Sequence, residues 1–110
     1  MRRFALIMAL LAGPVAADPW NVLDGAGVRA ALEGRVIVYE NATQDFRASG
    51  RTLYVFGGRD SWGYWRVEGD QYCSQWPPSD LWACYTVAVS GQSVRFIGTG
   101  DDVSEGVYGD

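Results

Sequence analysis

Residues 62–96, WGYWRVEGDQYCSQWPPSDLWACYTVAVSGQSVRF, decide the fold of this chain. They contain runs of β-branched and aromatic residues, a pattern typical of strands, separated by turn-forming sequences. Gly69-Asp70 and Gly91-Gln92 each have the composition of a two-residue hairpin turn. If these turns form, four cross-strand pairs follow: Val67 with Tyr72, Trp65 with Ser74, Val89 with Val94, and Val87 with Phe96.

Two cysteines, Cys73 and Cys84, lie in neighbouring strands of this pattern. An even number of cysteines favours a disulfide in a chain that begins with an export signal, which is described below. Directly opposed residues of antiparallel strands are close enough for this bond, and the pairing also places Tyr72 opposite Tyr85. The wide spacing disfavours a redox motif of the Cys-x-x-Cys kind. We therefore expect a structural disulfide that ties two adjacent strands.

Because side chains alternate along a strand, the expected register sorts them into two faces. The first face is apolar and predicts the core: Trp65, Val67, Tyr72, Tyr85, Val87, Val89, Val94 and Phe96. The second face mixes aromatic residues, an arginine and the disulfide: Trp62, Tyr64, Arg66, Cys73, Cys84 and Thr86. Both hairpin turns predict the same apolar face independently. We interpret the second face as a second packed layer or a binding surface.

Upstream of this region, Asp24 to Gly34 is the one credible helix. Asp24 suits the N-cap, and Gly34 suits the position just after the helix C-terminus. Strands are predicted over 35–40 and 52–56, with a polar loop over 41–50 between them. We expect a mainly β, small α+β fold. A short N-terminal helix packs on an antiparallel meander of about five or six strands, curled into a lipocalin-like barrel or half-barrel.

The N-terminal residues have the pattern of a signal peptide. A basic pair, Arg2 and Arg3, precedes an apolar run, and Val15-Ala16-Ala17 matches the small-residue cleavage pattern. The apolar run is too short for a membrane-spanning helix. We therefore divide the chain into a signal peptide over 1–17, a single β-rich domain over 18–97 and an acidic, mobile tail over 98–110. This division predicts a soluble periplasmic or secreted protein with no membrane span.

The composition excludes several classes of function. The chain has no histidine and no lysine, and both of its methionines lie in the predicted signal peptide. Histidine-dependent nucleophilic catalysis, haem ligation by His or Met, and histidine-based zinc sites are therefore excluded. The net charge of −4 argues against nucleic acid as a partner, because nucleic acid needs a cationic surface. We expect no cofactor and no metal site.

The segment 74–82, inside the predicted disulfide loop, is the main candidate binding site. Its two prolines, Pro77 and Pro78, cannot continue a central strand, so the chain must bulge outward there. Trp76, Leu81 and Trp82 would then lie on a stiff loop, and tryptophan is among the residues that dominate protein interfaces. Alternatively, Trp76 and Trp82 fold back as a lid over the end of the barrel. Three residues of the second face complete the candidate set: Trp62, Tyr64 and Arg66.

Three functions are compatible with these features. The first is a protein-binding or inhibitor-like module that engages a periplasmic protein partner through the loop from Trp76 to Trp82. The second is a lipocalin-like carrier that holds a small molecule inside the barrel. The third is a carboxylate-dependent hydrolase using Asp60 with Glu68, or Asp70 with Asp80, although turn and surface roles explain these carboxylates more simply. We favour the first function and expect no enzymatic activity.

Two segments resemble a signature of small exported alphaproteobacterial proteins of unknown function. One combines WRVEGDQYCSQWPP (65–78) with WACY (82–85), and the other is LDGAGVRAALEG (23–34). The resemblance spans most of the chain after the predicted signal peptide. It implies a periplasmic location and a β-meander, and it assigns no catalytic or binding residue.

Overall fold

The computed structural model describes residues 19–110, and the predicted signal peptide over 1–17 lies outside the described residues. The described chain is mainly β, with one short helix and nine strands in one antiparallel sheet. In chain order the elements are β1 (Asn21–Val22), α1 (Gly25–Leu32), β2 (Arg35–Val38), β3 (Ala42–Phe46), β4 (Arg51–Phe56), β5 (Arg59–Glu68), β6 (Gln71–Gln75), β7 (Trp82–Ser90), β8 (Ser93–Ile97) and β9 (Val103–Tyr108).

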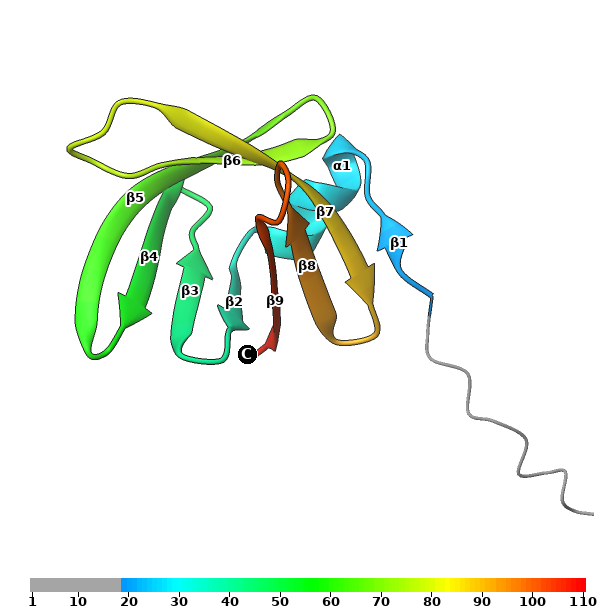
Figure 1. Ribbon diagram of the computed structural model, residues 1–110, viewed down its shortest axis with the longest axis horizontal. Helices are drawn as coiled ribbons and strands as arrows, with labels where there is room; N and C mark the ends of the chain where they lie inside the picture. The colour runs from blue at the N-terminus through cyan, green and yellow to red at the C-terminus, as the bar shows by residue number, and fades with distance from the viewer. Residues whose placement is uncertain (1–18) are drawn as a thin grey trace, which may run out of the picture.

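Eight of these strands close into a barrel (Figure 1). From β2 to β9 each strand pairs with the next one in the chain, and β9 also pairs with β2, which completes the ring. The short β1 lies outside the ring and pairs with the end of β7, where Asn21 is opposite Val89. The expected antiparallel barrel is confirmed and is closed, but its ring has eight strands where about five or six were predicted, because β3 and β9 lie in segments predicted to be a loop and a tail. A ring of eight strands has an interior that side chains can fill or that can hold one small ligand.

The register predicted from the two hairpin turns is confirmed at every position. The structure pairs Val67 with Tyr72, Trp65 with Ser74, Tyr72 with Tyr85, Val87 with Phe96 and Val89 with Val94. Cys73 lies directly opposite Cys84 on β7, their Cα atoms are 4.0 Å apart, and they form the disulfide. The predicted apolar face is the core face, since each of its eight members is buried or packs against the buried cluster.

The prediction of a polar loop over 41–50 is wrong for its first half, which forms β3. Ala42, Gln44 and Phe46 alternate inward and are buried, whereas Thr43 is exposed. The polar composition concealed this alternation because Gln44 faces the barrel interior, where other side chains satisfy its hydrogen bonds.

The prediction of a solvated tail over 98–110 is also wrong, because residues 103–108 form the strand that closes the barrel. β9 pairs with β8 over five positions, and its end pairs with β2. Two acidic residues of the segment pair with arginines of neighbouring strands, Glu105 with Arg95 on β8 and Asp110 with Arg35 on β2. Acidic composition alone therefore gave a misleading prediction.

Helix α1 covers one end of the barrel. It begins as predicted, with the Asp24 carboxylate accepting a hydrogen bond from the Gly27 N–H at 2.8 Å. Gly34 follows the helix with a φ of 75°, a conformation that favours glycine. The first helical N–H, that of Gly25, donates to the Asp70 carboxylate in the β5–β6 turn at 2.8 Å. These contacts fix the helix to the turns at that end.

The core fills only the half of the barrel that α1 covers. Val28 and Leu32 of the helix pack against Phe46, Trp65 and other buried residues of the strands. Successive turns of an up-and-down barrel lie at alternate ends, so the β2–β3 and β4–β5 turns and the β6–β7 loop gather at the far end. No helix reaches that end in the described part of the chain. The barrel is therefore covered by α1 at one end and open at the other, and we call the open end its mouth.

The described chain has one short helix and a disulfide, and the disulfide bears on the compartment in which the protein folds. Among residues 19–110, no helix combines the length and the apolar character needed to cross a membrane. The Cys73–Cys84 disulfide fits a protein that folds in an oxidising compartment outside the cytosol.

Candidate functional site

A pocket of about 980 Å³ opens at the mouth of the barrel. Its walls come from inward-facing positions of the strands, including Gln44 on β3, Tyr54 on β4 and Ser104 on β9. Trp76 and Pro77, which follow β6, complete the wall on the side of the β6–β7 loop. The pocket and the apolar core share one barrel interior, with the pocket at the open end and the core at the helix end.

Six aromatic rings form a continuous series around this pocket, which we call the aromatic belt. In order of contact they are Trp76, Tyr54, Tyr39, Phe96, Tyr72 and Tyr85. Neighbouring ring centroids are 5.3–6.2 Å apart, within the range for favourable aromatic pairs. All six residues line the pocket. Beneath them Phe46 contacts both Tyr72 and Phe96, so the core supports the belt.

A hydrogen-bond network joins the polar groups at the bottom of the pocket. The Tyr39 hydroxyl donates to Gln44 Oε1 at 2.8 Å. Gln44 Nε2 donates to Thr52 Oγ1 at 3.0 Å and to the Tyr72 hydroxyl oxygen at 3.2 Å. Thr52 in turn donates to the backbone carbonyl of Asp45. Gln44 and Thr52 are almost fully buried, and both amide protons of Gln44 are used within this network, which fixes the amide in place.

Burial controls the ionisation of the tyrosines in the network. Loss of hydration raises the pKa of the Tyr39 and Tyr72 hydroxyls. Burial is also the main reason that the pKa of Tyr85 is raised, and a hydrogen bond with the Asp102 carboxylate acts in the same direction. These phenols therefore remain neutral at physiological pH and keep their protons for hydrogen bonding.

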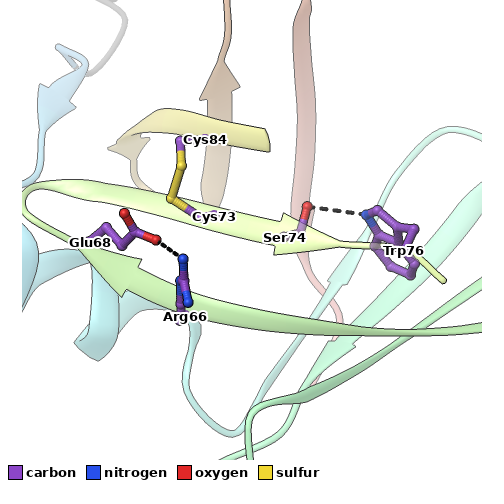
Figure 2. Close-up of a disulfide and its surroundings, with 6 residues drawn as sticks. All are labelled: Arg66, Glu68, Cys73, Ser74, Trp76 and Cys84. Carbon is purple, nitrogen blue, oxygen red and sulfur yellow. Dashed lines mark hydrogen bonds and ion pairs between the residues drawn. A yellow bond between two sulfur atoms is a disulfide. The ribbon is translucent and has the colours of Figure 1, made fainter. Parts of the chain in front are cut away.

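Trp76 folds back into the mouth of the barrel. Its indole N–H donates to Ser74 Oγ at 3.1 Å (Figure 2). Its ring also makes an edge contact with Tyr54. Gly63 of β5 leaves the room for this ring, since a Cβ at Gly63 would lie 2.6 Å from Trp76 Cε3. The lid-like arrangement is thus the one observed for Trp76. Pro77 lines the pocket beside it, whereas Pro78 and Leu81 are exposed on the loop.

The remaining predicted site residues lie on the outside of the barrel. We call Trp62, Tyr64, Arg66 and Trp82 the outer patch. The Arg66 guanidinium stacks on the Trp82 ring with its Cζ 3.8 Å from the ring centroid, and it also forms an ion pair with Glu68 next to the disulfide (Figure 2). Trp62 borders the pocket, while its ring contacts the arginines on the outer surface. The candidate set therefore divides into a pocket group and a surface group.

The charged residues that line the pocket are all acidic. Glu40, Asp60 and Glu105 are exposed, and Glu105 is paired with Arg95 on β8. The six rings of the aromatic belt, Gln44 and the lining serines carry no charge at neutral pH. The interior of the pocket is therefore uncharged, and its edge is negative.

The proposed carboxylate pairs do not come together. Asp60 and Glu68 lie at opposite ends of β5, a strand that spans roughly 30 Å, whereas glycosidase carboxylates are roughly 5–10 Å apart. Asp70 and Asp80 lie beyond opposite ends of β6, and the Asp70 carboxylate already accepts the N–H of Gly25. This geometry does not suit a reaction that needs two cooperating carboxylates.

Sequence reasoning missed most of the pocket. No site residue was predicted in the two strands or the loop that supply Tyr39, Gln44 and Tyr54. Ser104 lies in the segment that was predicted to be a tail. Period-two alternation from Ala42 to Phe46 would have placed Gln44 on the inward face, and Tyr54 lies directly opposite Gln44 on β4.

Comparison with protein-family models, with curated proteins and with solved structures finds no match to this chain.

Proposed function

We propose that this protein binds a small organic molecule in the pocket at the open end of its barrel. The observation that carries the proposal is the aromatic belt around a pocket of about 980 Å³. Ligand sites in proteins are typically concave, largely aromatic or apolar, and supplied with a few fixed polar groups. The Gln44 network and the Tyr72 and Ser74 hydroxyls supply such groups here. This favours the carrier hypothesis over the loop-binding hypothesis.

The test is binding of Nile red, an uncharged dye whose fluorescence rises in apolar surroundings. We expect saturable binding of one dye per protein. Ser104→Trp, which places an indole at a residue that lines the pocket, should abolish it. Thr43→Trp is the matched control, because Thr43 is exposed on β3 and is not a pocket residue. Equal dye binding by wild type and Ser104→Trp would reject the pocket as the site.

We further propose that the protein acts in the periplasm or is secreted. The disulfide supports this location, and the signal peptide predicted over 1–17 would provide the route. The intact mass of the protein recovered from its natural host tests both points. It should correspond to a chain starting at Asp18 and lacking two hydrogens at the disulfide. A cytosolic protein retaining residues 1–17 would contradict the proposal.

A second candidate function is the binding of another protein through the outside of the barrel. The observation in its favour is exposed apolar surface: Leu81 is 76% exposed, and Trp62 and Tyr64 of the outer patch are 38% and 43% exposed. Aromatic residues and arginine are enriched at protein interfaces. Leu81→Ser and Tyr64→Ser change this surface without changing a pocket-lining residue. Loss of a pulled-down partner with both variants, but not with Ser104→Trp, would favour this function over the first.

A further inference from the structure

We propose that the pocket selects an uncharged ligand that carries a hydrogen-bond acceptor, such as a ketone or amide oxygen, and that this oxygen binds the hydroxyl pair of Tyr72 and Ser74. The inference rests on the proposed small-molecule-binding function and names the class of ligand. Two observations support it: the hydroxyl protons of Tyr72 and Ser74 at the bottom of the pocket, and the charged side chains around its mouth.

The Tyr72 and Ser74 hydroxyls hold one proton more than their neighbours can accept. The Tyr72 oxygen accepts from Gln44 Nε2, and the Ser74 oxygen accepts from Trp76 Nε1. The two hydroxyls also interact with each other, which accounts for at most one of their two protons. Within residues 19–110 the structure places no acceptor for the other proton. Whichever hydroxyl donates within the pair, the other is left with a free O–H group.

This free donor is buried and lies at the pocket wall. Tyr72 is 5% exposed and Ser74 is 4% exposed, and both line the pocket. A buried donor without an acceptor is costly, so a ligand oxygen that fills this place gains affinity, and an isosteric methyl group does not. The surrounding rings of Tyr54, Tyr85 and Phe96 would contact the apolar body of such a ligand.

The charges around the pocket disfavour an anionic ligand. Among residues 19–110, those that line the pocket include no arginine, and the exposed carboxylates of Glu40 and Asp60 lie at the mouth. Arg59 at the start of β5 is exposed and does not line the pocket. A buried carboxylate would therefore lose its hydration without gaining a cationic partner. The free hydroxyl alone does not offset that loss, which leaves a neutral acceptor as the favoured partner.

Three naphthalene derivatives of similar shape test the proposal: 2-acetylnaphthalene, 2-isopropylnaphthalene and 2-naphthoate. Their affinities for the chain from Asp18 to Asp110, with its disulfide formed, are measured by calorimetry. We expect 2-acetylnaphthalene to bind about tenfold or more tightly than the isopropyl compound, which lacks the acceptor. We expect 2-naphthoate to bind most weakly. The double variant Tyr72→Phe/Ser74→Ala, which removes both hydroxyl protons, should reduce the acetyl-to-isopropyl ratio towards one, while Tyr64→Phe on the outer patch should leave it unchanged.

The possible results separate the two proposals. If acetyl and isopropyl compounds bind equally, or if naphthoate binds best, the pocket is a ligand site and the assigned ligand class is wrong. If no compound and no Nile red binds, the small-molecule function itself is wrong. Should the double variant unfold the protein, the wild-type affinities still decide, because equal binding of the acetyl and isopropyl compounds overturns the inference. An unchanged ratio in a folded double variant also overturns it.

Discussion

The indole of Trp76 occupies the space where Gly63 has no side chain. A Cβ on Gly63 would lie 2.6 Å from Trp76 Cε3 and 2.7 Å from the backbone oxygen of Gln75. Glycine in the middle of a strand usually weakens the strand, so its presence in β5 needs a local reason. Close approach of the Trp76 ring supplies that reason and explains how a residue of the β6–β7 loop becomes part of the pocket.

Gly63→Ala should therefore displace Trp76 and weaken the fold. Overpacking of this kind costs about 1–3 kcal/mol in the free energy of unfolding, which exceeds the gain of roughly 0.5–1 kcal/mol expected from replacing a strand glycine by alanine. Urea unfolding measures the stability, and Nile red titration reports the pocket. In the double variant with Trp76→Ala the loss should be smaller than the sum of the two single losses. Additive losses would show that the ring and the glycine are not coupled.

A second close approach fixes the position of the helix. A Cβ on Gly25 would lie 2.3 Å from the carbonyl oxygen of Gly69, and the Gly25 N–H donates to Asp70. Alanine is the better helix former by about 1 kcal/mol. We nevertheless expect Gly25→Ala to destabilise the protein, because the backbone contact must open. The free energy of unfolding from urea titration tests the sign.

Gly27→Ala is the matched comparison within the same helix. The nearest atoms to its added Cβ are side-chain atoms of Asp24 and Leu23 at 3.2 Å, which can move more easily than backbone. Its effect on stability should be clearly smaller than that of Gly25→Ala. A stabilising Gly25→Ala would mean that helix propensity outweighs the contact with the β5–β6 turn.

The buried tyrosines predict a loss of stability at alkaline pH. Burial raises the pKa of Tyr39, Tyr72, Tyr85 and Tyr108 in the folded state, whereas tyrosines in the unfolded chain titrate near pH 10. Above about pH 10 the unfolded state therefore binds fewer protons than the folded state, and the free energy of unfolding falls as pH rises. Below that pH the contribution is fully present. Urea midpoints measured from pH 7 to pH 11.5 should be flat at first and then decline.

Tyr39→Phe tests the cause of this decline. Removing the Tyr39 hydroxyl also removes its hydrogen bond to Gln44, so the variant should be less stable at pH 7. Its stability should nevertheless fall less steeply than that of the wild type above pH 10. Tyr64→Phe on the outer patch is the control and should follow the wild-type slope. Parallel curves for Tyr39→Phe and the wild type would assign the decline to other groups.

The region from β5 to β8 could be predicted from the sequence because its information is local. Two short turns, at Gly69-Asp70 and Gly91-Gln92, fix the register, and the opposed cysteines confirm it independently. The same register gives the inward face correctly. Each of these inferences depends only on strands that follow one another in the sequence.

The pocket could not be predicted in this way because its residues are brought together by closure of the ring. Gln44 is a polar residue on an inward face. Tyr39 and Thr52 lie near it in the chain, but its third partner, Tyr72, lies 28 residues away. Trp76 was identified as a site residue, but its direction depends on the missing side chain of Gly63 on a neighbouring strand. The acidic C-terminal segment was mispredicted for a similar reason, since one of its two partner strands, β2, lies far away in the chain.

That C-terminal segment gives the sharpest test of the barrel. Val103–Tyr108 pairs on one side with β8 and on the other with β2, and the Tyr108 hydroxyl donates to the backbone oxygen of Ala31 in α1 at 2.8 Å. A chain ending at Asp102 would leave two open sheet edges and expose the core between them. We expect it to lose cooperative thermal unfolding and to aggregate.

A chain ending at Tyr108 separates closure from the terminal contacts. It keeps β9 and loses only the last two residues, including the ion pair of Asp110 with Arg35, whose side chains are partly exposed. Exposed ion pairs contribute little to stability, so this chain should melt cooperatively and close to the melting temperature of the full-length protein. If the chain ending at Asp102 melts in the same way, β9 does not hold the barrel closed. The stability of the domain would then come from β1, the helix and the β2–β8 meander, because those are the elements that truncation leaves in place.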